Sequence, residues 1–409
     1  MSSDREFDVV LLGATGFTGK LVAEFLAETY GTGQTLNWAL AGRNQAKLES
    51  VRAGLGEEAA SLPLIIVDSS DASALNEMAA RTRVICTTVG PYALHGSKVV
   101  EACVDQGTHY CDLTGEVQWM YRMIEQFQSR AEASGARIVH TCGFDSIPSD
   151  LGVLFTQNQM QAKHGVYGDS VKFRVADSRG GVSGGTIASM MNMMEEVRED
   201  PSIRDIINDP YALNPLNMPR GEDGPDQLVA MYDADFKAWT APFVMAAINT
   251  RVVRRSHALM GYPWGKQFRY DEAMLTGPGP QGYLKAVAIA AGSVMTMLGA
   301  AFGPVRSMMK SLLPAQGEGP SLETRESGYF DIEFYAANSS ASDKCIKVRV
   351  TGDKDPGYGA TARMLGESAV CLAKDSLETG GGFWTPATAM GDRLIQRLQA
   401  NAGMKFTVL

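Results

Sequence analysis

The chain has 409 residues and a formal net charge of -9; 45% of its residues are hydrophobic and 20% are charged. This balance is typical of a globular protein, and the length predicts two or three domains. The negative charge argues against nucleic-acid binding, which needs clustered Lys and Arg, although it is compatible with a local phosphate pocket.

The six cysteines show no Cys-x-x-Cys pair, no cluster with His at metal-binding spacing and no disulfide pattern. We therefore expect no metal ion, and reduced thiols in a cytoplasmic protein. Residues 1–7 are polar and charged, so no secretory signal is expected there.

Short apolar runs alternate with helical patterns through residues 1–150. We expect strands at 7–12, 36–41, 64–67, 84–89, 109–112 and 137–140, with helices between them. Continuous apolar runs bounded by Gly or Pro are typical of buried parallel strands. The alternation predicts an α/β domain with a doubly wound parallel sheet of the Rossmann type.

The pattern changes after Pro148. A helix is expected at 151–160 and strands at 171–176, 243–254, 328–335 and 345–350, with long loops at 208–226 and 314–320. This predicts a second, α+β domain at 151–355 with a mainly antiparallel sheet. We expect this domain to bind the substrate and to form the interface of a homodimer. Helices at 356–409 are expected to pack back on the first domain.

The glycine-rich loop after the first strand opens a helix, which is the context of a dinucleotide site. Gly13 permits a tight turn, Gly16 lets the backbone approach a pyrophosphate, and Gly19 lets the helix pack closely on the sheet. Thr15, Phe17 and Thr18 complete the loop, and its free N–H groups would bind the pyrophosphate. The alternative is a glycine-rich turn without a ligand.

The end of the second strand distinguishes NAD from NADP. Arg43 stands where an acidic residue would bind the ribose of NAD, and Lys47 follows one turn later. An arginine here accommodates the 2′-phosphate of NADP(H), unless Arg43 only begins a solvated helix.

Two further strand ends are expected to contact the same cofactor. Asp68 is expected near the adenine, and Gly90, Pro91 and Tyr92 near the nicotinamide ribose, because ligands bind beyond the carboxyl ends of parallel strands. The alternative for Gly90 and Pro91 is an ordinary turn.

Five polar residues in neighbouring loops are candidates for substrate binding. They are His95, Thr114, Glu116, Asp145 and Ser146. Turn and capping chemistry is the alternative for the last four. No catalytic residue is assigned: Tyr262 and Lys266 match the Tyr-x-x-x-Lys pattern, but Pro263 and Gly265 between them prevent the helix that this pair needs.

Residues 286–305 contain no charged side chain. A buried helix, an interfacial helix and, least favoured, a transmembrane helix compete for this segment. Arg306 and Lys310 beside it predict weak peripheral contact with an anionic membrane. The methionines at 190–194 are interpreted mainly as core packing.

Several motifs together resemble one family. Residues 13–19 (GATGFTG), 41–43 (AGR), 89–92 (VGPY), 111–116 (CDLTGE) and 143–150 (GFDSIPSD) occur in the order found in saccharopine dehydrogenase-like oxidoreductases. Together with 380–387 (GGGFWTPA), they resemble the branch that includes trans-acting enoyl reductases of bacterial lipid synthesis. The resemblance implies an NADPH-dependent reductase of an enoyl or other lipid-like substrate. A non-catalytic, lipid-associated NADP-binding protein is the alternative.

Overall fold

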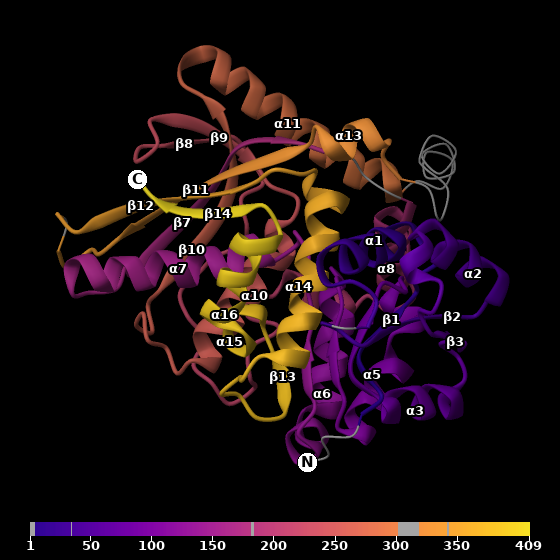
Figure 1. Ribbon diagram of the computed structural model, residues 1–409. Coiled ribbons are helices and arrows are strands. Elements are labelled where there is room, and N and C mark those ends of the chain that lie inside the picture. The colour runs from indigo at the N-terminus through magenta and orange to yellow at the C-terminus, as the bar shows by residue number, and fades with distance from the viewer. Residues whose placement is uncertain (1–4, 34, 181–183, 302–318, 342) are drawn as a thin grey trace.

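The computed structural model describes residues 5–33, 35–180, 184–301, 319–341 and 343–409. Two seven-stranded sheets organise this part of the chain (Figure 1). The first contains the six strands of residues 1–150 together with one strand from near the C-terminus, and the second contains the remaining strands. Helix α14 (Thr361–Lys374) lies between the two halves of the molecule.

The first sheet is parallel throughout and has the order β13-β6-β5-β4-β1-β2-β3. Its strands are β1 (Phe7–Leu12), β2 (Trp38–Gly42), β3 (Leu64–Ile66), β4 (Thr82–Thr87), β5 (His109–Cys111), β6 (Arg137–Val139) and β13 (Gly382–Trp384). The helices that alternate with them are α1 (Phe17–Tyr30), α2 (Gln45–Gly54), α3 (Ala72–Arg81), α4 (Tyr92–His95), α5 (Ser97–Gln106) and α6 (Val117–Ser134). The predicted doubly wound Rossmann sheet is confirmed.

Strand β13 comes from the far end of the chain and completes this sheet at the edge beside β6. Phe383 pairs with Ile138 in parallel register, and the Arg137 guanidinium donates to the carbonyl oxygen of Thr379 at 2.7 Å. Helix α14 packs on α1, where the Tyr30 hydroxyl donates to Glu367 at 2.5 Å. The C-terminal region therefore belongs structurally to both halves.

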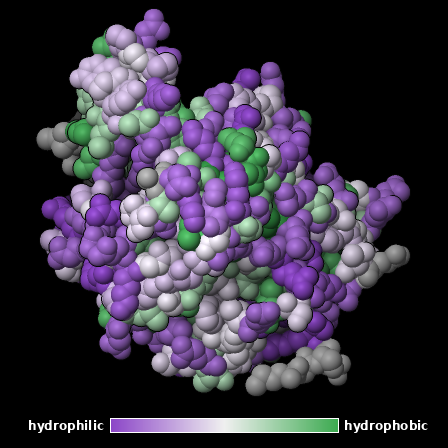
Figure 2. Space-filling view, turned by 90° about the vertical axis from the view of Figure 1, so that its left-hand side faces the viewer, coloured by the Kyte–Doolittle hydropathy of each residue, from purple (hydrophilic) through white to green (hydrophobic). Residues whose placement is uncertain are grey.

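The second sheet has the order β14-β12-β11-β7-β10-β9-β8, and within it only β7 and β10 pair in parallel. Its strands are β7 (Ser170–Arg179), β8 (Met231–Asp233), β9 (Ala238–Pro242), β10 (Arg269–Gly277), β11 (Tyr329–Ala337), β12 (Cys345–Gly352) and β14 (Met404–Val408). The mainly antiparallel sheet is as predicted. Figure 2 shows the surface on the left-hand side of Figure 1, where this sheet lies. On this face hydrophobic residues gather in small groups among hydrophilic ones.

Seven further α-helices of the described ranges lie between or beside these strands. They are α7 (Ile147–His164), α8 (Gly184–Glu199), α9 (Ile203–Asn208), α11 (Gly279–Ala301), α13 (Leu322–Glu326), α15 (Pro386–Ala389) and α16 (Gly391–Asn401).

The strand expected at 243–254 is wrong, because most of this segment belongs to helix α10 (Ala246–Leu259). Three buried arginines lie on this helix at helical spacing, namely Arg251, Arg254 and Arg255. Their guanidinium groups donate hydrogen bonds to carbonyl and carboxylate oxygens of the 207–226 segment and of β13. These long-range contacts stabilise the helix although its Val and Ile residues favour a strand.

Each of these arginines has its own partners. Arg251 pairs with Asp226, and Arg254 donates to Asp223 at 2.7 Å. Arg255 donates to the carbonyl oxygens of Leu213 and Phe383, the latter at 2.8 Å. The long loop predicted at 208–226 is therefore attached along α10, and through Arg255 it is linked to the first sheet.

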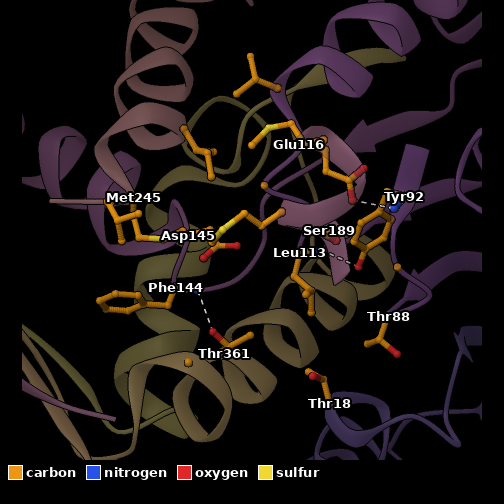
Figure 3. A pocket seen from close by; sticks show the side chains of 18 of the residues that line it. Thr18, Thr88, Tyr92, Leu113, Glu116, Phe144, Asp145, Ser189, Met245 and Thr361 are labelled. Carbon is orange, nitrogen blue, oxygen red and sulfur yellow. Dashed lines mark hydrogen bonds between the residues drawn. The ribbon is translucent and has the colours of Figure 1, made fainter. Parts of the chain in front are cut away.

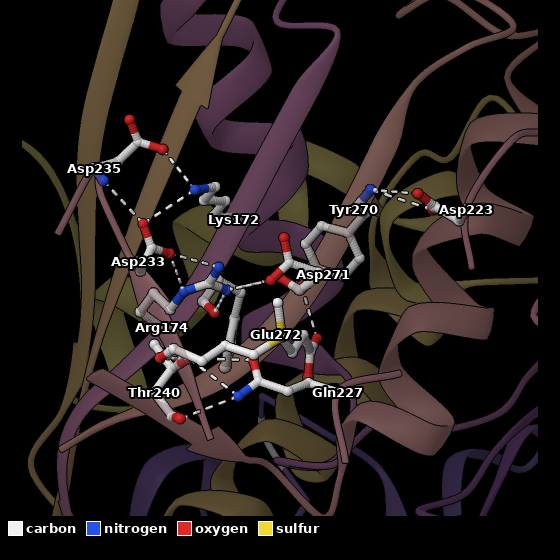
Figure 4. A network of polar contacts seen from close by, with 12 residues as sticks. Lys172, Arg174, Asp223, Gln227, Asp233, Asp235, Thr240, Tyr270, Asp271 and Glu272 are labelled. Atoms are coloured by element: carbon white, nitrogen blue, oxygen red, sulfur yellow. Dashed lines mark hydrogen bonds and ion pairs between the residues drawn. The ribbon is translucent and has the colours of Figure 1, made fainter. Parts of the chain in front are cut away.

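A second polar network holds the β8–β9 hairpin to β7 (Figure 4). Asp233 lies between Lys172 at 3.0 Å and Arg174 at 2.7 Å. The Gln227 amide donates to the carbonyl oxygen and hydroxyl of Thr240, both at 3.1 Å. These contacts fix the 225–228 segment against the second sheet.

Helix α11 covers most of the charge-free segment, and the buried-helix interpretation is wrong for residues 286–295, the part whose side chains are described. Val287, Val294 and Met295 are exposed by 39%, 45% and 73%, whereas Ala286 and Ala290 are buried. The helix packs on β9 and β10. Arg306 and Lys310 lie outside the described residues. Among the helices in the described ranges, none is long and apolar enough to cross a membrane.

We expect Arg255→Ala to lower the free energy of unfolding by about 3 kcal/mol, because it leaves two buried carbonyl oxygens without donors. Chemical denaturation of the wild-type and variant proteins would measure this. Arg204→Ala, at an exposed position of α9, is the control and should change stability by less than about 0.5 kcal/mol. Equal stabilities of the two variants would contradict the role given to Arg255.

Candidate active site

A cavity of about 1670 Å³ lies at the carboxyl ends of the parallel strands. One side is formed by the loops that follow β1 to β6, and the other by α8, α10, α11 and the 225–228 segment. Small-molecule pockets usually measure about 300–1,000 Å³. The cavity therefore has room for a second ligand beside a dinucleotide.

The glycine loop is shaped by backbone contacts that exclude larger side chains. Gly13 has a φ of 91°, and a Cβ atom there would lie 2.7 Å from Val89. A Cβ atom on Gly19 would lie 2.2 Å from the carbonyl oxygen of Gly13. Glycine at these two positions lets the chain turn sharply and lets α1 begin directly beneath the loop.

The N-terminus of α1 faces the cavity through Thr15, Gly16, Phe17 and Thr18. Among the described residues, no side chain caps this end and its first turn holds no acidic residue. Its N–H groups and the positive end of the helix dipole are therefore available to a pyrophosphate. The residues present fit the phosphates of a dinucleotide.

Positive charge gathers at the end of β2. Arg43 and Lys47 line the cavity and are exposed, and within the described residues neither forms an ion pair. Asp68 accepts hydrogen bonds from Ser70 at 2.7 and 2.8 Å, which lower its pKa, and the charges of Arg43 and His95 lower it further. The His95 side chain is therefore close enough to the Asp68 carboxylate to affect its pKa.

The loop after β4 reaches the cavity through Thr88, Val89 and Gly90, whereas Pro91 does not line it. Tyr92 lines the wall but is 3% exposed, and its ring stacks on Trp119 with centroids 5.6 Å apart. Its hydroxyl donates to the carbonyl oxygen of Thr87 at 3.2 Å. Tyr92 therefore supports the loop on which Gly90 lies.

Glu116 lines the cavity from the loop after β5, and Figure 3 shows its contact with Tyr92. Its carboxylate accepts the backbone N–H groups of Tyr92 at 2.8 Å and Ala93 at 2.9 Å. Burial raises its pKa, and these two hydrogen bonds oppose that rise. Thr114 lies behind the wall, where its hydroxyl accepts the N–H of Glu116 at 3.1 Å.

Asp145 projects into the cavity from the loop after β6 (Figure 3). Ser146 is fully buried instead, and its hydroxyl donates to Asn249 at 3.2 Å. Of the five substrate candidates, the structure thus brings His95, Glu116 and Asp145 to the cavity and places Thr114 and Ser146 behind it.

An apolar chamber adjoins this part of the cavity. Its wall includes Met190, Met193, Met194, Phe243, Met245 and Ile248. None of these residues was predicted as part of the site, because the 190–194 run is typical of core packing and a strand was expected at 243–254. The cluster of methionines was the available signal, since this side chain also forms adaptable binding surfaces.

Tyr262 and Lys266 do not line the cavity. Tyr262 has a φ of 62°, and its hydroxyl donates to the carbonyl oxygen of Pro219 at 2.6 Å. No helix joins the two residues, which agrees with the interpretation of a chance match.

Comparison with known proteins identifies the fold and the family. Residues 9–139 match the family described as the saccharopine dehydrogenase NADP binding domain. A Mycobacterium tuberculosis protein provisionally named a trans-acting enoyl reductase is 41% identical over 98% of this chain and 97% of its own length. The chain belongs to the saccharopine dehydrogenase-like oxidoreductase family. A trans-acting enoyl reductase of Mycobacterium leprae is 37% identical to this family member over 97% of both chains.

One solved structure shares the complete fold of this saccharopine dehydrogenase-like oxidoreductase. The apo saccharopine dehydrogenase (L-Glu forming) of Saccharomyces cerevisiae has a TM-score of 0.53 and 14% identity, with 98% of this chain and 99% of the yeast chain covered. The matched N-terminal domain identifies NADP(H) as the cofactor, in agreement with the glycine loop.

We expect Arg43→Asp to weaken NADPH binding by more than tenfold, about 1.4 kcal/mol, because it replaces the cation expected at the 2′-phosphate with an anion. NADH binding should change little. Titration of nicotinamide fluorescence would measure both affinities, with Lys163→Asp at the exposed end of α7 as the charge-matched control. Equal affinities of the wild-type protein for the two cofactors would exclude this role.

Proposed function

We propose that the protein is an NADPH-dependent reductase of a lipid-like substrate that carries a carbon–carbon double bond conjugated to a carbonyl group. The observation that carries this proposal is the continuation of the dinucleotide cleft into the apolar chamber. Apolar walls with a few polar groups are typical of sites for such ligands. The enoyl reductase names of the relatives support the reaction type.

The position of the chamber favours catalysis over simple cofactor storage. In a doubly wound sheet the nicotinamide is expected near the loops after β4 and β5. Met193 and Met245 line the same cavity as Gly90, Gly115 and Glu116 of these loops. When bound, NADPH would supply a hydride there, while the residues of the chamber orient an apolar chain and exclude water.

A non-catalytic, lipid-associated NADP-binding protein is the alternative. It would bind the same two ligands without consuming NADPH. Oxidation of NADPH with a panel of enoyl and keto thioesters of increasing chain length separates the two functions. An absence of turnover with the entire panel would contradict the reductase.

We expect Met245→Glu to raise the KM for a long-chain enoyl thioester by about tenfold or more, because a carboxylate replaces an apolar contact in the chamber. The KM for a four-carbon thioester should change little. Met218→Glu is the control, since Met218 is partly exposed and does not line the cavity. If Met245→Glu affected both substrates equally, the chamber would not be the chain-binding site.

We also propose that α11 contacts anionic membranes weakly, as expected from the sequence. Leu284, Val294 and Met295 are exposed on this helix, while Ile289 of the same helix lines the cavity. Binding to anionic vesicles should weaken at high salt and should fall further in Leu284→Asp/Met295→Asp. Vesicle sedimentation would measure this, with Val408→Asp on β14 as the control. An absence of vesicle binding at low salt would exclude the membrane contact.

The homodimer and the cytoplasmic location that we expect from the sequence stay predictions.

A further inference from the structure

The Asp145 carboxyl group occupies an unusual position in the cavity wall. It is partly exposed to the cavity and otherwise enclosed by protein. A Cβ atom on Gly115 would lie 3.7 Å from its Oδ2 atom, so the carboxyl group lies against the loop after β5. Within the described ranges, it has no hydrogen-bond or ion-pair partner.

The residues on both sides of Asp145 are anchored. The backbone N–H of Phe144 donates to the Thr361 hydroxyl at 2.9 Å, and its ring contacts Phe330 with centroids 5.1 Å apart. Ser146 is held by Asn249. These anchors direct the Asp145 side chain toward the space beside Leu113 and Met245, as Figure 3 shows.

The other acidic groups of the cavity wall are already engaged. Glu116 accepts two backbone N–H groups, and Asp226 pairs with Arg251. Asp68 binds Ser70 on the side of the cavity where Arg43 lies. Among the described carboxyl groups of the wall, Asp145 alone is both unpartnered and next to the apolar chamber.

The surroundings of Asp145 favour its protonated form. Burial raises its pKa to about 7, and the negative charge of Asp112 adds to this rise. Asp112 is itself held by the Tyr110 hydroxyl at 2.8 Å and by His140 at 2.7 Å. Glu116 and Glu272 are bound to partners of their own, as is Asp150 at the start of α7, which accepts hydrogen bonds from Ser256 and the Ala387 N–H. The cations of α10 are also engaged: Arg251 pairs with Asp226, Arg254 with Asp223, and Arg255 with two backbone carbonyl oxygens. His257 of the same helix lies against the carbonyl oxygen of Gly265.

We propose that Asp145 is the catalytic acid that protonates the substrate during its reduction. This inference rests on the proposed function. As the hydride of NADPH reaches the β-carbon of the conjugated double bond, the π electron pair shifts to the α-carbon, which takes the proton of the Asp145 carboxyl. One C–H bond forms at each carbon, the double bond becomes single, and NADPH is oxidised to NADP⁺. The Asp145 carboxylate recovers its proton from water.

The test uses Asp145→Asn with NADPH and an α,β-unsaturated dodecenoyl thioester of N-acetylcysteamine. General acid catalysis contributes about 10²–10⁴-fold, so kcat should fall at least a hundredfold while the Kd for NADPH stays within twofold. Wild-type kcat should fall as the pH rises above about 7, because the acid form is lost, and the residual rate of Asp145→Asn should lack this decline. Asp145→Glu should recover part of the activity.

Asp343→Asn, at an exposed position between β11 and β12, is the matched control and should leave kcat and its pH profile unchanged. An Asp145→Asn protein with wild-type kcat, or with the same decline above pH 7, overturns the inference. Infrared spectroscopy gives a readout without turnover. Burial also raises the pKa values of Asp150 and Glu272 to about 7, and these two groups contribute equally to both proteins. The difference spectrum of wild type minus Asp145→Asn at neutral pH should therefore contain a protonated carboxyl band from Asp145 alone. If the wild type does not oxidise NADPH with any enoyl thioester, the proposed function fails, while a difference spectrum without this band overturns the role of Asp145 by itself.

Discussion

The arrangement of the cavity depends on three guanidinium groups that are buried on one helix. Arg251, Arg254 and Arg255 of α10 are each at most 4% exposed, and a buried cation without partners would cost several kcal/mol. Their partners lie in the segment that precedes β8 and in β13, so these parts must stay close to α10. The far wall of the cavity is consequently attached to the core, and the chamber keeps its shape beside the cofactor loops.

The first sheet could be predicted because its determinants are local in the sequence. A fully buried parallel strand requires a continuous apolar run, and the turn at Gly13 requires a residue without a side chain. The helix α10 could not be predicted in the same way, since Val252 and Val253 favour a strand. The spacing of Arg251, Arg254 and Arg255 was a helical signal, but their partners lie in distant segments that no periodicity identifies.

The same limit applies to the site. Arg43 and the glycine loop were predicted because their chemistry follows directly from their place after a strand. Glu116 and Asp145 reach the cavity whereas Thr114 and Ser146 do not, although all four belong to two short polar loops. The direction of a loop side chain depends on tertiary partners such as Asn249 and Ile248, which come from α10. A run of methionines such as that of α8 looks the same in the sequence whether its side chains line a cavity or pack in a core.

The position of β13 has a consequence for biosynthesis. Residues 382–384 form the edge of the nucleotide-binding sheet, although the rest of that sheet is contained in residues 7–139. While the chain is still on the ribosome, β6 has an unpaired edge throughout the synthesis of some 240 further residues. Exposed strand edges promote wrong pairing with other chains. Chaperone binding to the nascent chain would therefore prevent wrong pairing of β6 chiefly during this interval. A variant truncated before β13 would expose that edge permanently.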